Sequence, residues 1–335
     1  MNFTGNETEL GQQDTTCVFV DSNAERISKL CAYCVILLGS LFGNVFIIVI
    51  VYKNQDLRRT INYFIVNMAI SDLVFPLIVH PVKITELLTE SLHWHVGGIL
   101  GSIFCKLFYF ASSVSLLVSV QSLVWIAIDR FVAVVFPIKL GLISSKIRTI
   151  AIVSTWVLAG VFYSPLLITL ELVELGNNAF CRRATDTHEQ SMFPNTEAAK
   201  VYYWFHVTIR FIAPLVVTTI LYSALAISLN RQNKALAGNL STVAEQLYLK
   251  KRRQATQMAV IILVLFYICV IPYTVLHFLF PPIHYCAFLR LFEWPAYLMF
   301  FSSSIVNPVI CLSFVQTYRR GLKNILCPCG TMRDD

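Results

Sequence analysis

Seven long stretches of apolar residues, separated by short polar segments, follow one another along the chain. They run roughly over residues 27–52, 60–88, 102–136, 147–171, 200–230, 250–280 and 286–313. Each stretch is long enough to cross a lipid bilayer as an α-helix, which takes about 20 predominantly apolar residues. The stretches are continuous rather than alternating, and backbone polar groups have to be paired inside lipid. The pattern therefore predicts helices and excludes a β-barrel.

The composition supports the same fold class. Of the 335 residues, 56% are hydrophobic and only 13% are charged, whereas soluble domains have about 25% charged residues. We therefore expect one all-α membrane domain, a seven-transmembrane helix bundle over residues 27–313. Residues 1–26 form a polar N-terminal segment and residues 314–335 a short tail. The first apolar stretch is too long for the core of a cleavable signal peptide, so we expect it to stay as an anchor.

The distribution of basic residues predicts the orientation of the bundle. With the N-terminus outside the cell, most of the 26 lysines and arginines fall on the inner side, as the positive-inside rule requires. Glycosylation sequons beginning at Asn2 and Asn6 indicate the same orientation. We expect a multi-pass protein of the plasma membrane with a glycosylated, extracellular N-terminus. Its positive inner face suits anionic membrane lipids and an acidic protein partner.

The segment that follows the last apolar stretch, residues 313–326, has an amphipathic pattern. Its apolar residues recur at helical spacing: Phe314, Tyr318, Leu322 and Ile325. This spacing predicts a short amphipathic helix on the inner membrane surface. The two cysteines after it, Cys327 and Cys329, are candidates for palmitoylation. The alternative is a frayed polar tail with two free thiols.

A string of polar residues lies inside the apolar stretches: Asn44, Asp72, Ser115, Ser119, Ser303, Ser304 and Asn307. Asp72 is the only acidic residue deep within a stretch, and a carboxylate in lipid has to pair, bind a cation or stay protonated. Oxygen atoms of Asp72, Ser119 and Asn307 are hard ligands of the kind that a small cation such as Na⁺ accepts. A sodium site and a hydrogen-bonded network around a neutral Asp72 both fit the sequence.

The third apolar stretch ends in adjacent opposite charges. Residues 107–128 carry no charge, and Asp129, Arg130 and Phe131 follow them directly. A charged pair at the end of a membrane helix is costly unless it finds partners, so it is a functional candidate. Arg130 stays charged, and it can hold a partner on its own helix in one state and reach a protein partner in another. An ordinary flanking charge is the alternative.

The ten cysteines show no metal-binding spacing. Cys105 starts the third stretch, Cys181 lies in the loop before the fifth, and both face the oxidising side, so we expect a disulfide between them. In that loop, a Gly-Asn-Asn turn separates two short extended runs, which predicts a β-hairpin over the mouth of the bundle. Cys17 and Cys286 also lie on this side, and the sequence does not determine whether they pair.

Polar and aromatic residues gather in the outer half of the stretches. Three pairs are four residues apart and share a helix face: His206 with Arg210, Tyr273 with His277, and Glu293 with Tyr297. Arg210 lies about two turns inside the membrane at helical rise, so we expect it to meet an acidic ligand group or an acidic neighbour. Together with Lys83 and Glu86, these residues predict a ligand pocket. Interhelical hydrogen bonding near the headgroups is the alternative.

The order of these residues resembles the rhodopsin-like (class A) G protein-coupled receptors along almost the whole chain. The matching positions form an ordered series: Gly43-Asn44, Ser71-Asp72-Leu73, Trp94, Cys105, Asp129-Arg130-Phe131, Pro137, Trp156, Cys181, Pro214, Tyr222, Phe266, Cys269, Pro272, Asn307-Pro308 and Tyr318-Arg319. As a series they are highly specific. Within the family, the chain is most similar to the neuropeptide receptors.

The resemblance implies a receptor and not an enzyme. An extracellular agonist enters between the helices, the sixth span swings outward at its inner end, and a heterotrimeric G protein docks in the opened cleft. Arrestin is a further expected partner; nucleic acid, metal sites and cofactors other than sodium are not expected. The implied switch residues are Asp129, Arg130, Phe131, Tyr222, Phe266, Pro272, Asn307, Pro308 and Cys311. The implied ligand contacts are Glu86, Ser112, Leu116, His206, Arg210, Tyr273, His277, Glu293 and Tyr297.

Three departures from the family pattern affect the switch. Val270 replaces the tryptophan before the proline of the sixth span, and Cys311 replaces the tyrosine that ends the motif of the seventh span. The inner end of the sixth span has four successive basic residues, 250–253, and no acid is expected there to pair with Arg130. We therefore expect a rewired switch, with raised basal activity or weak coupling to a G protein.

The sequence favours a peptide as the ligand. The seventh span has no lysine for a retinal Schiff base, and Ser112 and Ser113 stand where amine receptors of this family have an aspartate. The hairpin-like loop, the rim of mixed charge and the polar pocket resemble peptide receptors. A lipid or another acidic small molecule that reaches Arg210 is the second candidate. A transporter is much less favoured, because the two halves of the chain show no internal repeat.

Overall fold

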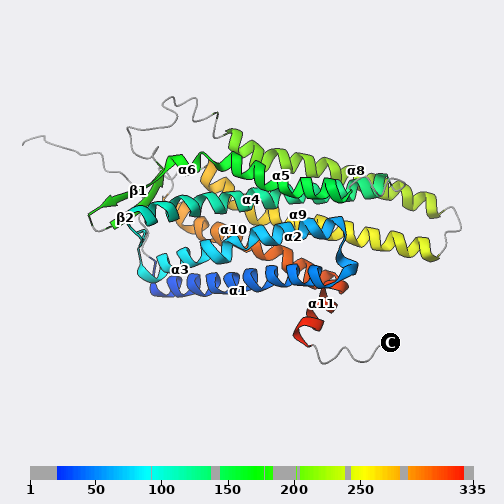
Figure 1. Ribbon diagram of the computed structural model, residues 1–335, viewed down its shortest axis with the longest axis horizontal. Coiled ribbons are helices and arrows are strands. Elements are labelled where there is room, and N and C mark those ends of the chain that lie inside the picture. The colour runs from blue at the N-terminus through cyan, green and yellow to red at the C-terminus, as the bar shows by residue number, and fades with distance from the viewer. Residues whose placement is uncertain are drawn as a thin grey trace, which may run out of the picture.

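Long helices lie side by side along one axis of the molecule (Figure 1). The computed structural model describes residues 21–91, 93–136, 144–176, 178–183, 201, 204–237, 243–279 and 286–327. For residues 56, 175, 178, 183, 233–237, 243–252, 277–279 and 286–291, only the backbone is described. Several predicted features lie outside the described residues: Asn2, Asn6, Cys17, Pro137, Cys329 and the side chains of His277 and Cys286.

Seven helical segments in the described part of the chain are long and apolar enough to span a membrane. They cover Asn23–Lys53, Thr60–Thr89, Gly98–Val135, Ser145–Thr169, Trp204–Gln232, Arg253–Leu276 and Phe292–Phe314. Each overlaps one of the predicted stretches, so the seven-helix architecture is confirmed. The predicted bounds 147–171 lie two residues too far along the chain, because the helical segment spans Ser145–Thr169 and the chain enters a strand at Leu170.

The helices of the first half are α1 (Asn23–Lys53), α2 (Thr60–Asp72), α3 (His80–Thr89), α4 (Gly98–Val135), α5 (Ser145–Tyr163) and the short α6 (Leu166–Thr169). Those of the second half are α8 (Ala213–Ala237), α9 (Val243–Leu279), α10 (Cys286–Phe314) and α11 (Gln316–Leu326). A π-helical turn over Phe75–Val79 joins α2 to α3. It contains Pro76, which lacks a backbone N–H and so disturbs the regular helical hydrogen bonds. A second π-helical turn, Thr208–Ile212, precedes α8.

Large apolar side chains cover the outside of the bundle. Val35 of α1 is 67% exposed, and Ile150 and Val161 of α5 are each 68% exposed. A water-soluble helix keeps such residues on its core side and places polar residues outside. Here the apolar residues face outward as well as inward, which is the arrangement that surrounding lipid stabilises.

Helix α4 runs through the centre of the bundle and packs against α2, α5, α8 and α9. Its residue Leu123 belongs to a large apolar core together with Phe64 of α2 and Phe266 of α9. Leu116, a predicted ligand contact, is 2% exposed and lies in the same core. The centre of the bundle is therefore closely packed, and the polar groups described below are embedded in it.

An antiparallel β-hairpin covers one end of the bundle (Figure 1). Its strands are β1 (Leu170–Leu175) and β2 (Asn178–Arg183), and Leu172 pairs with Cys181. Gly176 in the turn has φ +62°, a left-handed conformation that glycine adopts without strain. The predicted hairpin is confirmed, and we call this end of the bundle the hairpin end.

At the opposite end, α11 leaves the bundle at an angle after α10 (Figure 1). We call this the α11 end. The predicted amphipathic helix is present, but it begins at Gln316, and Phe314 is the last residue of α10. Tyr318 was predicted to face the membrane surface; instead it is buried against the bundle, with 1% of its surface exposed.

Candidate functional site

A buried carboxylate lies at the middle of the bundle. Asp72, at the end of α2, is 4% exposed. Ser119 of α4 donates a hydrogen bond of 2.8 Å to its Oδ1, and the Asn307 side-chain amide of α10 donates one of 2.8 Å to its Oδ2. The three residues predicted for a cation site therefore do come together. They connect α2, α4 and α10 through a single carboxylate.

Further polar contacts extend this network to α1. The Asn44 side-chain amide donates to the Ser304 carbonyl of α10 at 2.9 Å. Ser115 of α4 donates to the Ser71 carbonyl of α2 at 2.7 Å. The hydroxyls of Ser303 and Ser304 bond within their own helix, to the carbonyls of Phe300 and Phe301 respectively.

Two amide oxygens in this network are buried and receive no hydrogen bond from a described residue: Asn44 Oδ1 and Asn307 Oδ1. Unpaired buried acceptors are costly and usually find a donor or an ion. The donor set near Asp72 therefore consists of carboxylate, hydroxyl and amide oxygens, which are ligands suited to a hard cation.

The charged pair of α4 lies toward the α11 end. Arg130 Nε donates to Asp129 Oδ2 at 3.0 Å, and its Nη2 also contacts this carboxylate oxygen. Arg130 forms no ion pair with a described side chain of α9. The side chain of Tyr222 on α8 is close enough for the charges of Asp129 and Arg130 to act on it. Arg130 is thus held by a partner on its own helix, as predicted for one state of a switch.

The positions that depart from the family pattern are closely packed. Val270 of α9 and Cys311 of α10 are both fully buried, and Phe266 is 2% exposed. Pro272 lies within α9, and Pro308 lies within α10 against Gly43 of α1. The space around Val270 and Cys311 is therefore filled by other side chains.

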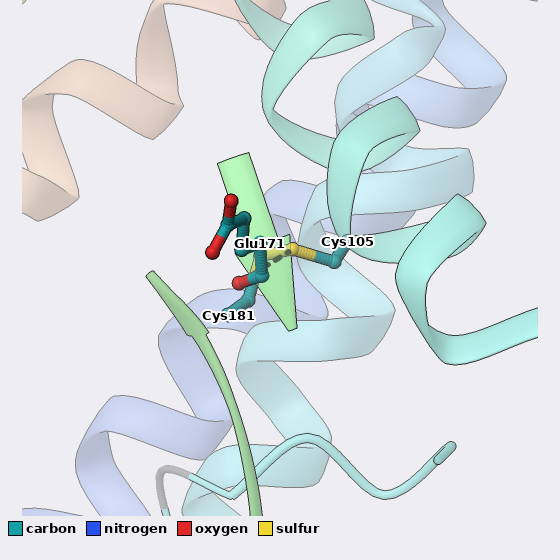
Figure 2. The surroundings of a disulfide bond; sticks show 3 residues. All are labelled: Cys105, Glu171 and Cys181. Atoms are coloured by element: carbon teal, nitrogen blue, oxygen red, sulfur yellow. Dashed lines mark hydrogen bonds between the residues drawn. A yellow bond between two sulfur atoms is a disulfide. The ribbon is translucent and has the colours of Figure 1, made fainter. Parts of the chain in front are cut away.

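The predicted disulfide joins the hairpin to α4. Cys105 and Cys181 are bonded, with Cα atoms 5.6 Å apart, and the Glu171 carbonyl lies next to the Cys105 sulfur (Figure 2). Two other contacts hold the hairpin. The carboxylate of Glu174 accepts a hydrogen bond of 2.8 Å from the Gly98 amide at the start of α4. The Trp94 amide donates to the Ala179 carbonyl at 2.6 Å. The hairpin is therefore fixed over this end of the bundle at several points.

One group of predicted ligand contacts involves α1, α3, α9 and α10. The rings of Tyr273 and Tyr297 are 5.1 Å apart. Glu293 is partly buried, and the charges of Lys29 and Lys83 act on its carboxylate. Lys83 is itself bound to Glu86 at 2.7 Å. This part of the hairpin end thus presents phenols and charges of both signs.

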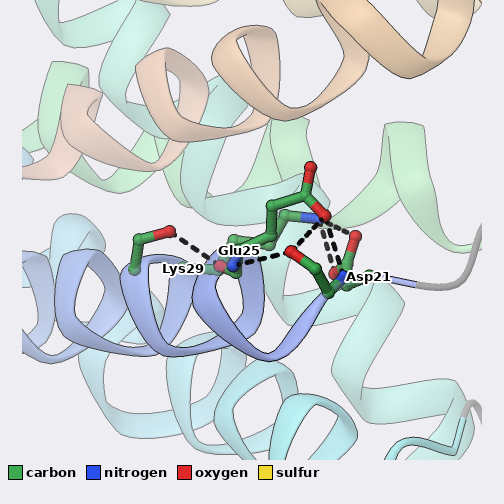
Figure 3. A network of polar contacts seen from close by, with 5 residues as sticks. Asp21, Glu25 and Lys29 are labelled. Carbon is green, nitrogen blue, oxygen red and sulfur yellow. Dashed lines mark hydrogen bonds and ion pairs between the residues drawn. The ribbon is translucent and has the colours of Figure 1, made fainter.

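The first helix contributes to the same group. Lys29 Nζ lies 2.6 Å from the Asp21 carboxylate and 5.3 Å from the centre of the Trp294 ring. Ser22 and Glu25 form a capping box that starts α1 beside this ion pair (Figure 3). The start of α1 is therefore ordered next to α10, and Lys29 is a candidate contact that sequence reasoning missed.

A second group of predicted contacts lies against α5. The His206 ring is 4.3 Å from the Phe162 ring, and the Arg210 guanidinium carbon is 5.9 Å from the centre of the Tyr163 ring. Arg210 Nε is buried and makes no hydrogen bond to a described residue. Its charge is therefore balanced by aromatic faces and not by a described acid. Ser112, a further predicted ligand contact, donates a hydrogen bond to the Phe108 carbonyl of its own helix.

Other residues missed by sequence reasoning fix the position of α2. The Asn67 side-chain amide donates to Ser122 of α4 at 2.8 Å and to Thr155 of α5 at 3.2 Å. Its carbonyl oxygen accepts a hydrogen bond of 2.8 Å from the Trp156 indole. A polar residue at a buried helical position is the signal that points to such a contact, although its partners are separated from it by 55 to 89 positions.

A bundle with seven helices long and apolar enough to span a membrane in its described part, a disulfide-fixed hairpin at one end and a charged pair at the other is consistent with a membrane receptor of the seven-helix class. The family described as "7 transmembrane receptor (rhodopsin family)" matches residues 43–310. The chain belongs to this family, and the resemblance seen in the sequence is confirmed.

Among curated proteins, the chain is similar to receptors for peptides. It is 29% identical to a QRFP-like peptide receptor of Branchiostoma floridae, over 88% of this chain and 76% of that protein. It is 26% identical to a RYamide receptor of Tribolium castaneum, over 89% of this chain and 80% of that protein. It is 25% identical to the substance-P receptor of Rattus norvegicus, over 92% of this chain and 74% of that protein.

Proposed function

We propose that this chain is a receptor of the plasma membrane that binds an extracellular peptide at the hairpin end and activates a heterotrimeric G protein at the α11 end. The N-terminus and the hairpin face outward, so that the Cys105–Cys181 disulfide lies in an oxidising compartment. The basic residues of α11 then face the anionic inner leaflet. Arrestin and inner-leaflet lipids are further partners at that end.

The observation that carries the proposal is the different chemistry of the two ends of the bundle. At the α11 end, Arg130 is held by Asp129 of its own helix, so an outward movement of the neighbouring helices would open access to a permanent cation that a protein partner can bind. At the hairpin end, two polar groups lie on different helices and offer both signs of charge. A peptide is long enough to contact both groups and carries polar groups along its length. The names of the similar receptors support the same ligand class.

Second-messenger output tests this function. Cells that express the chain are measured for cAMP and Ca²⁺, first without ligand and then with a panel of neuropeptides. A peptide that gives a saturable signal in these cells and none in untransfected cells supports the proposal. A peptide panel without effect, together with a response to fatty acids or other acidic lipids, supports the alternative of a small acidic ligand at Arg210. Confirmed surface expression with no response to either panel contradicts both.

Arg210→Gln is expected to reduce the potency of the active peptide by roughly 10- to 100-fold. The substitution removes a cation that sits in an aromatic setting without a described acidic partner, and charge-assisted hydrogen bonds in such sites contribute about 1.5–3 kcal/mol. Concentration–response curves measure the shift. Arg182→Gln on β2, an exposed arginine that stacks on Phe180, is the matched control. Equal potency of Arg210→Gln and the wild-type protein would exclude Arg210 from the ligand site.

We also propose that Asp72, Ser119 and Asn307 hold a sodium ion. Support comes from the buried carboxylate and from the two amide oxygens without described donors. The ion would supply charge neutralisation to Asp72 in a site that connects α2, α4 and α10. Neighbouring residues of the polar network would hold the sodium ligands in position. Ser71, for example, forms a hydrogen bond of 2.8 Å with Ser119.

Replacing 150 mM KCl by NaCl is therefore expected to lower basal nucleotide exchange by wild-type membranes, because an ion that binds one conformation favours it by mass action. The shift is expected to be a few-fold, with ionic strength held constant at roughly 150 mM. Asp72→Asn keeps the shape of the side chain but lacks the charge, and it is expected to abolish the difference between the two salts. A sodium effect that persists in Asp72→Asn places the ion elsewhere.

Modifications of both termini complete the proposed membrane topology. Cys327, the residue after α11, is exposed and has a free thiol, as a palmitoylation site requires. Cys329 and the glycosylation sites Asn2 and Asn6 remain predictions from the sequence. Labelling with a palmitate analogue and digestion with a glycosidase test these sites, with Cys327→Ser and Asn6→Gln as the respective variants.

A further inference from the structure

A buried phenol anchors the surface helix to the bundle. Tyr318 of α11 is 1% exposed, and its hydroxyl donates a hydrogen bond of 3.1 Å to Asn62 Oδ1 of α2. Burial raises the pKa of Tyr318 well above its usual value, so the phenol stays protonated and remains a donor. Breaking this bond would leave a buried hydroxyl and a buried amide oxygen unpaired.

The acceptor belongs to a part of the molecule that is held in place. Asn62 lies in the first turn of α2, and its side-chain amide donates to the Leu57 carbonyl at 2.7 Å. Five residues further along α2, Asn67 bonds to α4 and α5. Asn62 therefore offers a fixed point at the α11 end.

The donor moves with α10. Only Val315 separates α10 from α11, and the two helices are connected through its backbone. The Val315 amide donates to the Cys311 carbonyl at 3.2 Å, and the Arg319 amide donates to the Val315 carbonyl at 3.1 Å. On the other side of α11, a Cβ added to Gly321 would lie 2.7 Å from Ile50 of α1, so α11 also packs closely there. A displacement of the end of α10 therefore has to carry Tyr318 with it.

Tyr318 lies close to Cys311, the position at which the family pattern has a tyrosine. Cys311 of α10 is fully buried, and its thiol is close enough to act electrostatically on Tyr318. Tyr318 follows Cys311 by seven residues. The chain therefore has a phenol in the first turn of α11 and none at the end of the α10 motif.

We propose that Tyr318 is a positioning residue of the activation switch: its hydrogen bond to Asn62 holds the junction of α10 and α11 against α2 in the closed conformation. In that conformation Arg130 is still bound to Asp129. Opening the α11 end for a partner displaces the junction and breaks the bond, so the bond favours the closed conformation only. The effect of this bond on signalling rests on the proposed coupling to a G protein. The anchoring of α11 to α2 does not depend on that coupling.

Tyr318→Phe tests the proposal, since it removes the hydroxyl and keeps the ring. We expect basal nucleotide exchange, measured in membranes at equal receptor density, to rise roughly two- to tenfold, which is the change in a two-state equilibrium on loss of one such hydrogen bond. The matched control is Tyr63→Phe, one residue from Asn62 on α2, which keeps the ring that lies 3.9 Å from the Arg148 guanidinium. It is expected to leave basal exchange unchanged.

The partner is tested by Asn62→Ala and by the double variant. If the hydroxyl acts through Asn62, Tyr318→Phe adds nothing further to Asn62→Ala, whereas independent effects would multiply. Tyr318→Phe with wild-type basal exchange, or a fully multiplicative double variant, overturns the proposal. The comparison remains available if one of the single variants fails to reach the membrane, because the other removes the same bond.

Backbone hydrogen exchange of the purified receptor separates this proposal from the proposed function. Tyr318→Phe is expected to speed the exchange of amides in Gln316–Leu326 relative to Tyr63→Phe, with no G protein present. Faster exchange without any signal from wild type or variants would keep the anchor and contradict the coupling. Unchanged exchange in α11 contradicts the anchor, whatever the signalling result.

Discussion

Replacing Arg130 by alanine is expected to abolish ligand-dependent nucleotide exchange while the protein still reaches the cell surface. Arg130 is the permanent cation of the proposed switch, and Asp129 is its partner in the structure. Alanine cannot bind a partner protein through charge-assisted hydrogen bonds, each of which contributes about 1.5–3 kcal/mol. The expected loss in signal is therefore at least about tenfold, since roughly 1.4 kcal/mol corresponds to a factor of ten.

The control for this experiment is Arg320→Ala. Arg320 of α11 is exposed at the same end of the bundle and forms no ion pair with a described residue, so it tests the general loss of positive charge. Nucleotide exchange on purified G protein and surface labelling are measured together. If Arg130→Ala signals as well as Arg320→Ala, the charged pair is an ordinary flanking charge and not the switch.

Cys105→Ala is expected to cost the largest amount of stability among single substitutions at the hairpin end. The disulfide closes a loop with a sequence separation of 76 residues, and removing a native disulfide typically costs about 2–5 kcal/mol. Without it, the hairpin keeps only weaker anchors such as the Glu174–Gly98 hydrogen bond. We expect the surface level and the response to the active peptide to fall severalfold, because the covered end of the bundle loses its defined shape.

Cys181→Ala is expected to give the same loss, and the double substitution no more than either single one, because both partners act through one bond. Cys34→Ser is the control, since Cys34 of α1 is exposed and has a free thiol. Additive losses from Cys105→Ala and Cys181→Ala would mean that each cysteine acts independently of the disulfide. Surface labelling and the temperature of half-inactivation of the solubilised receptor measure the effect.

The departures at Val270 and Cys311 predict a rewired switch, and a measurement of basal signalling tests this prediction. The hydrogen bond between Tyr318 and Asn62 opposes one part of this prediction, a raised basal activity. Because Tyr318 bonds to Asn62, a phenol still connects the α10 end of the switch to α2 although Cys311 carries none. The sequence shows that Cys311 has no phenol and that Tyr318, seven residues later, has one. It does not show how the two positions are related, because this depends on how α11 folds back against α2.

The chain's own pattern of apolar stretches determined that it spans a membrane seven times, because about 20 apolar residues per helix and full backbone pairing leave no other arrangement in lipid. The turn at Gly176 and the charges at Asp129 and Arg130 were equally local signals. Hydrogen bonds between helices that are far apart in the sequence have no such local signal. The grouping of the ligand candidates has none either. His206 and Arg210 lie against α5, whereas Tyr273 of α9 lies against Tyr297 of α10. Only helix packing decides which face of each helix meets which neighbour, since a uniformly apolar helix has no polar side to orient it.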